Sequence, residues 1–170
     1  EDPTKGMVFV QFISDCIVEA NVQRQKNNES TKTVRMAVIL PVAAAIGSNK
    51  LLKETKQRLL VNNTLEAVFT LPNEIFYPGA SASACMMVFT LGKPHYDGDA
   101  PAKDTFFGYY KDDAHKKKKN LGRIEQFDEK NASKWKAVEE EWLKLYRNKT
   151  VKAGMSAMQS VTHEDEWLVE

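Results

Sequence analysis

A chain of 170 residues, of which 42% are hydrophobic and 28% charged, has the composition of one globular domain with its own core. Its net charge of +1 excludes binding to nucleic acid or membranes through overall charge, so any such contact depends on local clusters.

The cysteines and the N-terminal segment predict a cytoplasmic protein. Cys16 and Cys85 both lie within apolar runs, without the spacing of a disulfide framework, so we expect two buried thiols in a reducing compartment. No apolar stretch approaches the roughly 18 residues of a membrane span, and the sequence does not begin like a signal peptide, so we expect no membrane partner. The three histidines are scattered, and we predict no metal site.

The first 40 residues predict a helix, a loop and a buried strand. Asp2-Pro3 is a typical helix start, and the apolar side chains of residues 4–24 recur at helical spacing. These apolar positions are Phe9, Ile13, Cys16, Ile17 and Ala20. A polar loop follows, and residues 34–40 are almost continuously apolar, which is typical of a strand covered on both faces.

The next 50 residues predict a βαβ unit followed by a reversed strand. Gly47-Ser48 is the expected start of a helix, and residues 65–71 form the second strand, parallel to the first. Residues 72–83 contain two prolines, one glycine and no helical period, and this segment is short for a parallel crossover. We therefore expect the strand at 84–91 to run antiparallel to its predecessor, as a wide hairpin.

The remaining residues predict a linker and a helical region. We expect residues 94–130 to contain a short aromatic strand at 105–110 and a basic loop, and Ser133 to cap a helix with an aromatic face within residues 131–170. Thr162 to Asp165 resemble a capping box that opens a further helix. Residues 1–93 would form the α/β part of the chain.

Two parallel strands and one reversed strand leave at least one long apolar edge, which native proteins avoid. We therefore expect the chain to be a fragment of a larger α/β domain, or to cover this edge by forming a homodimer.

Two groups of residues are candidates for binding. Phe76 and Tyr77 either pack beneath their loop or offer a stacking surface for an extruded base. The basic block either contacts nucleic-acid phosphates or is a solvated charge run, partly balanced by neighbouring aspartates. The members of this block are Lys116, Lys117, Lys118, Lys119 and Arg123. No glycine-rich turn follows a strand, so no nucleotide cradle is predicted.

Three segments together resemble the N6-adenine DNA methyltransferases, and most closely the modification subunits of type I restriction systems. They are RMAVILPVAAAIGS at residues 35–48, LEAVFTLPNEIFYP at residues 65–78 and ACMMVFTL at residues 84–91. The later FFGYYKDD, KNLGRI and DEW stretches are similar to a branch of the same family. The resemblance covers most of the chain.

This resemblance implies the second half of a Rossmann-like S-adenosylmethionine-dependent methyltransferase fold, a mixed sheet whose last strand is antiparallel, with an α-helical extension. The family's cofactor-binding glycine-rich motif and its Asn-Pro-Pro-Tyr/Phe catalytic motif are absent. We therefore expect no catalytic residue here, an inactive chain, and no measurable binding of S-adenosylmethionine.

The resemblance also implies roles for particular residues and partners. An aromatic side chain of the matching loop, Phe76 or Tyr77, would stack on a flipped adenine, and Pro41 would lie near the same pocket. The implied partners are double-stranded DNA and the specificity and restriction subunits. The alternatives are a non-catalytic DNA- or protein-binding α/β module, and a purely structural fragment that dimerises.

Overall fold

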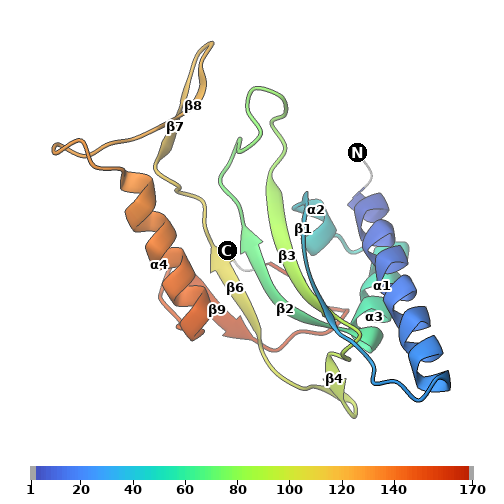
Figure 1. The fold of residues 1–170 in the computed structure, drawn as a ribbon. Coiled ribbons are helices and arrows are strands. Elements are labelled where there is room, and N and C mark those ends of the chain that lie inside the picture. The colour runs from blue at the N-terminus through green and yellow to red at the C-terminus, as the bar shows by residue number, and fades with distance from the viewer. Residues whose placement is uncertain (1–2, 169–170) are drawn as a thin grey trace.

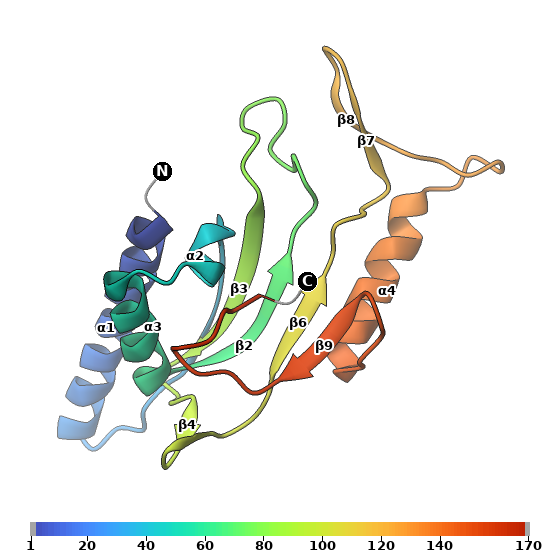
Figure 2. The same ribbon diagram turned by 180° about the vertical axis from the view of Figure 1, so that it is seen from behind.

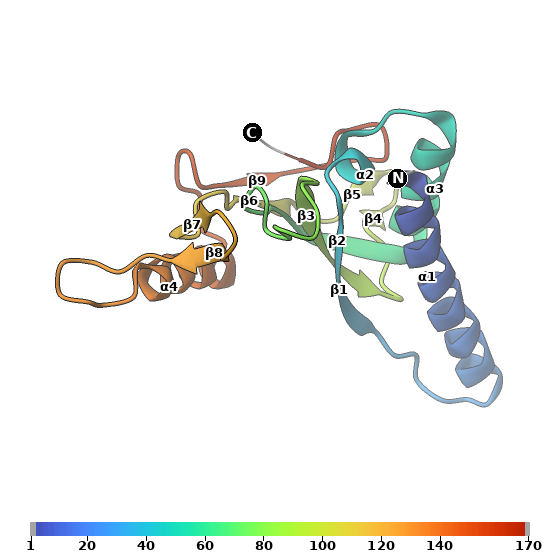
Figure 3. The same ribbon diagram turned by 90° about the horizontal axis from the view of Figure 1, so that it is seen from above.

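The computed structural model describes residues 3–168, which form a mixed β-sheet with helices on both faces (Figure 1). The sheet contains β1 (Val34–Pro41), β2 (Asn63–Thr70), β3 (Ala84–Leu91), β6 (Thr105–Tyr109) and β9 (Ser156–Gln159). One face carries α1 (Pro3–Lys26), α2 (Ala43–Ile46) and α3 (Lys50–Asn62), and the other carries α4 (Lys134–Asn148) (Figure 3). Two small hairpins lie outside the sheet: β4 (Tyr96–Asp97) with β5 (Ala100–Pro101), and β7 (His115–Lys118) with β8 (Gly122–Glu125).

The strand order is β1-β3-β2-β6-β9, with β3 between β1 and β2 and antiparallel to both. Because β2 and β6 are parallel, β1, β2 and β6 all run in one direction. The predicted wide hairpin is confirmed, as is the shared direction of the two strands of the βαβ unit. The result is the mixed sheet with an inserted reversed strand that the family resemblance implies.

Apolar side chains form a core on each face of the sheet. Successive residues of β2 point to opposite faces, so Val68 joins the core under α1 and α3, whereas Phe69 joins the core under α4. All eight residues of β2 are buried. The predicted aromatic face of α4 is confirmed, and Ser133 caps this helix by accepting a hydrogen bond from Lys136 N–H at 3.1 Å.

The prediction that the first strand is covered on both faces is wrong. β1 lies at the sheet edge, and its Arg35, Ala37 and Ile39 are exposed while Leu40 is buried. The helix on that face, α4, packs against β6 and does not reach β1 (Figure 3). The apolar sheet edge expected from the sequence is therefore present at β1.

The first helix is confirmed, but its predicted buried face is only partly right, since Ile13 and Ile17 do pack half-buried against the core. Met7, Val10 and Ser14 are fully buried, whereas Phe9 is 62% exposed and Cys16 is also exposed. Ser14 accepts a hydrogen bond of 2.7 Å from the Asn63 side chain, and this contact orients the helix against the start of β2. Of the two thiols expected to be buried, only that of Cys85 is. The suggested cap at Asp2 lies outside the described residues.

Two further expectations need correction. The helix α3 is capped by Asn49, whose side chain accepts from Leu52 N–H at 2.9 Å, and not by Gly47-Ser48. Residues 162–168 form turns and not a helix, although Asp165 accepts from both the backbone N–H and the hydroxyl of Thr162, as in the predicted capping box. The sequence did not indicate β9. The sheet therefore takes strands from each of the three predicted segments, residues 1–93, 94–130 and 131–170. The division at residues 93 and 130 stays a prediction.

Residues 160–168 return from β9 across the sheet to α2 and α3 (Figure 2). The buried Lys56 holds this segment, since its ammonium donates to Ala45 O at 2.6 Å and to Asp165 O at 3.2 Å and lies 4.9 Å from the ring centre of Trp167. Burial lowers the pKa of Lys56 to about 8, although nearby acidic side chains oppose the change.

A fully buried histidine ties the same segment to the sheet. The Nδ1 atom of His95 accepts from Leu65 N–H at 3.3 Å, so the proton resides on Nε2, which donates to Val161 O at 3.1 Å. Burial lowers the pKa of His95, and this outweighs the opposing effect of the hydrogen bond to Val161.

The free energy of unfolding should therefore fall as the pH is lowered below about 6.5, the pKa of histidine in the unfolded chain. The unfolded state binds a proton in that window and the folded state does not. Replacing His95 with asparagine should remove this part of the pH dependence and lower stability at pH 7 by about 1–3 kcal/mol. Urea denaturation at pH 7 and pH 5 measures both effects. His163→Asn is the matched control, and equal pH dependence of wild type and His95→Asn would contradict the assignment.

Candidate nucleic-acid interface

The strands β1, β2 and β6 end on the same side of the sheet, which we call the carboxyl edge. The residues at this edge are Pro41, residues 71–83 and residues 110–125. The strands β1, β2 and β6 all point toward it, and backbone hydrogen bonds join the segments there. These bonds are Val42 N–H to Ser83 O, Leu71 N–H to Ala84 O and Tyr110 N–H to Thr70 O, each 3.0 Å. Ligands of open α/β sheets bind at this edge. The candidate residues predicted from three separate stretches of sequence therefore lie at one end of the molecule (Figure 1).

The aromatic loop, residues 72–83, connects β2 to β3 at this edge. Pro72 ends β2, and the loop turns through Glu74, whose positive φ of 56° lies in the left-handed region. Backbone bonds from Tyr77 N–H to Glu74 O (2.8 Å) and from Ala80 N–H to Phe76 O (3.1 Å) hold the turn. Phe76 is 45% exposed and Tyr77 is half-buried, so at least Phe76 offers an accessible ring.

The β7–β8 hairpin follows β6 and carries the basic block. Its register pairs Lys117 with Arg123, so these two side chains share one face, whereas the neighbouring Lys116 and Lys118 point to the opposite face. Lys117 contacts the aromatic loop: its Nζ lies 2.7 Å from Glu74 Oε1 and 4.2 Å from the ring centre of Tyr77. The structure thus brings together Tyr77 and Lys117, which the sequence separates by 40 positions.

The outward-facing lysines are the accessible part of the block. Lys116, Lys118 and Lys119 are exposed, and none of them forms an ion pair with any residue between 3 and 168. Their ammonium groups are therefore available to a phosphate, while that of Lys117 is engaged by Glu74.

Arg123 is engaged as well, at the base of the hairpin. Its guanidinium donates two hydrogen bonds of 2.7 Å to the carboxylate of Asp113, which is only 7% exposed. Burial by itself pushes the pKa of Asp113 upward, but the hydrogen bonds from Arg123 and from His115 N–H outweigh it and hold this pKa below its usual value. The role of Arg123 as a phosphate contact stays a prediction, and its ion pair with Asp113 competes with such a contact.

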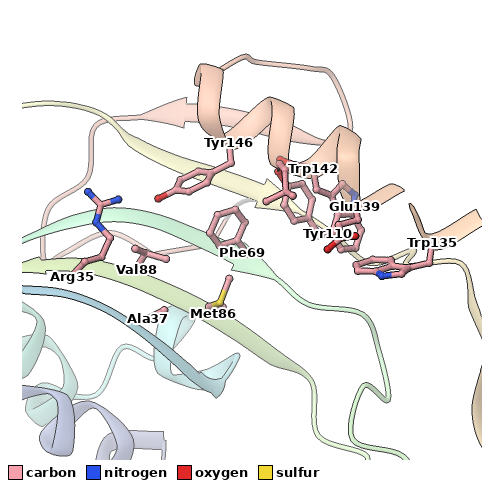
Figure 4. Close-up of a pocket in the computed structure, with 11 residues that line it drawn as sticks. Arg35, Ala37, Phe69, Met86, Val88, Tyr110, Trp135, Glu139, Trp142 and Tyr146 are labelled. Atoms are coloured by element: carbon pink, nitrogen blue, oxygen red, sulfur yellow. Dashed lines mark hydrogen bonds between the residues drawn. The ribbon is translucent and has the colours of Figure 1, made fainter. Parts of the chain in front are cut away.

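An apolar cavity of about 410 Å³ lies beside the carboxyl edge, between the sheet and α4 (Figure 4). One wall is a stack of Tyr110 on Trp142, with ring centres 4.4 Å apart and planes inclined by 4°, and the Tyr110 hydroxyl donates to Trp142 O at 3.1 Å. Burial raises the pKa of Tyr110 to about 12, so its hydroxyl stays protonated. Arg35 and Glu139 are the charged residues that line the cavity. The aromatic face of α4 was the only signal of this cavity in the sequence.

The described residues, 3–168, contain no cluster of histidine, cysteine, aspartate or glutamate side chains able to hold a metal ion. Within the same range, no helix combines the length and apolar character needed to cross a membrane.

Solved structures share this fold. A modification subunit of a putative type I restriction enzyme from Vibrio vulnificus matches 77% of the chain with 18% identity and a TM-score of 0.53. The methyltransferase subunit of a type I restriction-modification system from Streptococcus thermophilus matches 74% of it with 19% identity and a TM-score of 0.54. The mixed sheet with an inserted reversed strand and a helical part is thus a methyltransferase-type α/β architecture.

The sequence comparison specifies the family. Residues 23–167 match the model of the N-6 DNA methylase family, and the chain belongs to that family. A type II restriction enzyme and methyltransferase from Heyndrickxia coagulans, RM.BcgI, is 29% identical over 96 residues, which is 56% of this chain. The chain spans 14% of that relative and 23% of each of the two solved chains.

Replacing Arg123 with methionine should lower the free energy of unfolding at pH 7 by about 3 kcal/mol, because it leaves the buried Asp113 carboxylate without its partner. The loss should shrink below about pH 4, where Asp113 becomes protonated in the variant as well as in the unfolded chain. Urea denaturation at both pH values measures it, with Lys118→Met as the matched surface control. If Arg123→Met were as stable as Lys118→Met, Arg123 would not serve mainly to pair with Asp113.

Proposed function

We propose that this chain is part of a site-specific adenine-N6 DNA methyltransferase of a restriction-modification system, and that it supplies a DNA-contacting surface at the carboxyl edge. One observation carries the proposal: in a chain of the N-6 DNA methylase family, the exposed ring of Phe76 and three lysines without an ion-pair partner among residues 3–168 lie at that edge. The reaction would transfer a methyl group from S-adenosylmethionine to the N6 amino group of adenine.

The residues of this chain have separate tasks in that reaction. Lys116, Lys118 and Lys119 bind backbone phosphates, which sets the position of the duplex without reading its sequence. Phe76 or Tyr77 stacks on the extruded adenine, because chemistry on a base requires that it leave the duplex. Pro41 lies at the end of β1, next to the strand that follows the aromatic loop.

The turns of this chain do not suit the cofactor. The segments that follow β1, β2 and β6 begin with Val42-Ala43, Leu71-Pro72 and Tyr110-Lys111, without the glycines that let a backbone approach a nucleotide. We therefore assign S-adenosylmethionine binding and the catalytic motif to other parts of the enzyme. A cytoplasmic location and association with specificity and restriction subunits belong to the same proposal.

Duplex DNA should bind the chain in a salt-dependent manner. Replacing Lys116, Lys118 and Lys119 together with alanine should reduce the slope of log K against log salt concentration by roughly 2–3, since each phosphate contact contributes about 0.9. Fluorescence anisotropy with a labelled duplex at several salt concentrations measures this slope. Replacing Lys26, Lys32 and Lys93 with alanine removes the same charge far from the carboxyl edge and should change the slope little.

Equal slopes for these two triple variants would contradict the DNA-contact proposal. Binding to an unrelated protein without any binding to DNA would favour the second candidate function, a protein-binding α/β module. That candidate is suggested by β1, whose edge position and exposed Ile39 suit pairing with another chain, including a second copy. Light scattering of the same sample reports the homodimer.

The chain alone should not bind S-adenosylmethionine, because its turns lack the required glycines. Isothermal titration of the cofactor into the chain should give only the heat of dilution seen in a buffer control. A dissociation constant in the micromolar range would contradict the assignment of the cofactor site to other parts of the enzyme.

A further inference from the structure

One ion pair joins the two elements of the carboxyl edge. Lys117 extends from the hairpin to the aromatic loop, with its Nζ 2.7 Å from Glu74 Oε1 and 4.2 Å from the ring centre of Tyr77. The hydrogen bond with Glu74 is the main reason that the pKa of Lys117 is raised. Both partners are partly exposed, with 46% of the Lys117 side chain and 38% of the Glu74 side chain accessible. Solvent-exposed pairs of this kind are weak and are screened by salt.

The carboxylate of Glu74 occupies the position that a phosphate oxygen would take beside an ammonium group. Lys116 and Lys118, one residue away on either side, point to the opposite face of the hairpin and have no such partner among the described residues. Strand alternation therefore divides consecutive lysines into free ones and a masked one. A backbone phosphate carries one negative charge, as the Glu74 carboxylate does. It can replace this carboxylate because the ion pair is exposed and weak, and because the free lysines bind other phosphates of the same duplex.

We propose that Glu74 acts as a phosphate mimic that masks Lys117, and that a DNA phosphate displaces it when the duplex binds. The proposal rests on the proposed function and deepens it, because it names Glu74 as a residue that sets the affinity for DNA. With Glu74 in place, breaking the ion pair offsets part of the free energy gained when Lys117 binds a phosphate, and the carboxylate repels the approaching backbone.

The displacement has a consequence for the aromatic loop. In the free chain, the ammonium of Lys117 covers one face of the Tyr77 ring. When Lys117 turns to a phosphate, that face becomes available to a base, and the ion pair no longer ties the loop to the hairpin. Phosphate binding is thereby coupled to exposure of the stacking surface.

The test is a double-mutant cycle read through the affinity for duplex DNA and its salt dependence. Glu74→Gln should tighten binding roughly threefold to tenfold at low salt, because no ion pair has to be broken and no carboxylate repels the duplex. Lys117→Met should weaken binding more in the Glu74→Gln background than in the wild-type background, because in the wild type part of the gain from Lys117 is offset by the broken pair. Lys118→Met should reduce the salt slope by about 0.9 in both backgrounds.

Two controls keep the result interpretable. Glu74→Asp retains the charge and should not tighten binding, and urea denaturation shows that each variant is folded. A Lys117→Met variant that weakens binding equally in both backgrounds, or a Glu74→Gln variant with unchanged affinity, would overturn the masking. If Lys118→Met has no effect in either background, the proposed DNA surface fails instead, and the masking fails with it.

Discussion

The direction of β3 determines where the other parts of this molecule lie. The strand β3 is inserted between β1 and β2 and pairs antiparallel with both. This pairing gives hydrogen-bond partners to the backbone of β3, whose side chains are largely buried. A strand that returns antiparallel must be reached by a loop at the end where its predecessor stops. The aromatic loop is therefore placed at the edge where β1 and β6 also end, and the candidate interface follows from that single reversal.

Charge pairing then determines which residues of the interface are accessible. The register of the β7–β8 hairpin turns Lys117 and Arg123 toward acidic partners, and it leaves Lys116 and Lys118 facing solvent. Five basic residues that form one block in the sequence thus have two different roles in space. The buried Asp113 requires Arg123, whereas the pair between Glu74 and Lys117 is exposed to solvent and weak.

The two faces of the sheet are covered to different extents. The face under α1 and α3 is closed by the C-terminal segment through Lys56, His95 and Trp167. The other face is covered by α4 over β6 but is open over β1, where the apolar cavity and the exposed Ile39 lie. An open apolar sheet edge is a surface that native proteins cover, and it is the observation behind the second candidate function.

The sequence by itself determined the features that depend on short-range signals. The apolar runs of β2 and β3, the break at Pro72 and the cap at Ser133 predicted these elements, and the LPNEIFYP stretch indicated the family and the candidate ring of Phe76. Only the tertiary structure decided which face of α1 is buried, because that helix is apolar on several sides and packing against α3 and β1 selects Met7 and Val10. It likewise decided β9, whose four residues form a strand only through pairing with β6, and the division of the lysines, which depends on a hairpin register and on a glutamate 43 positions away.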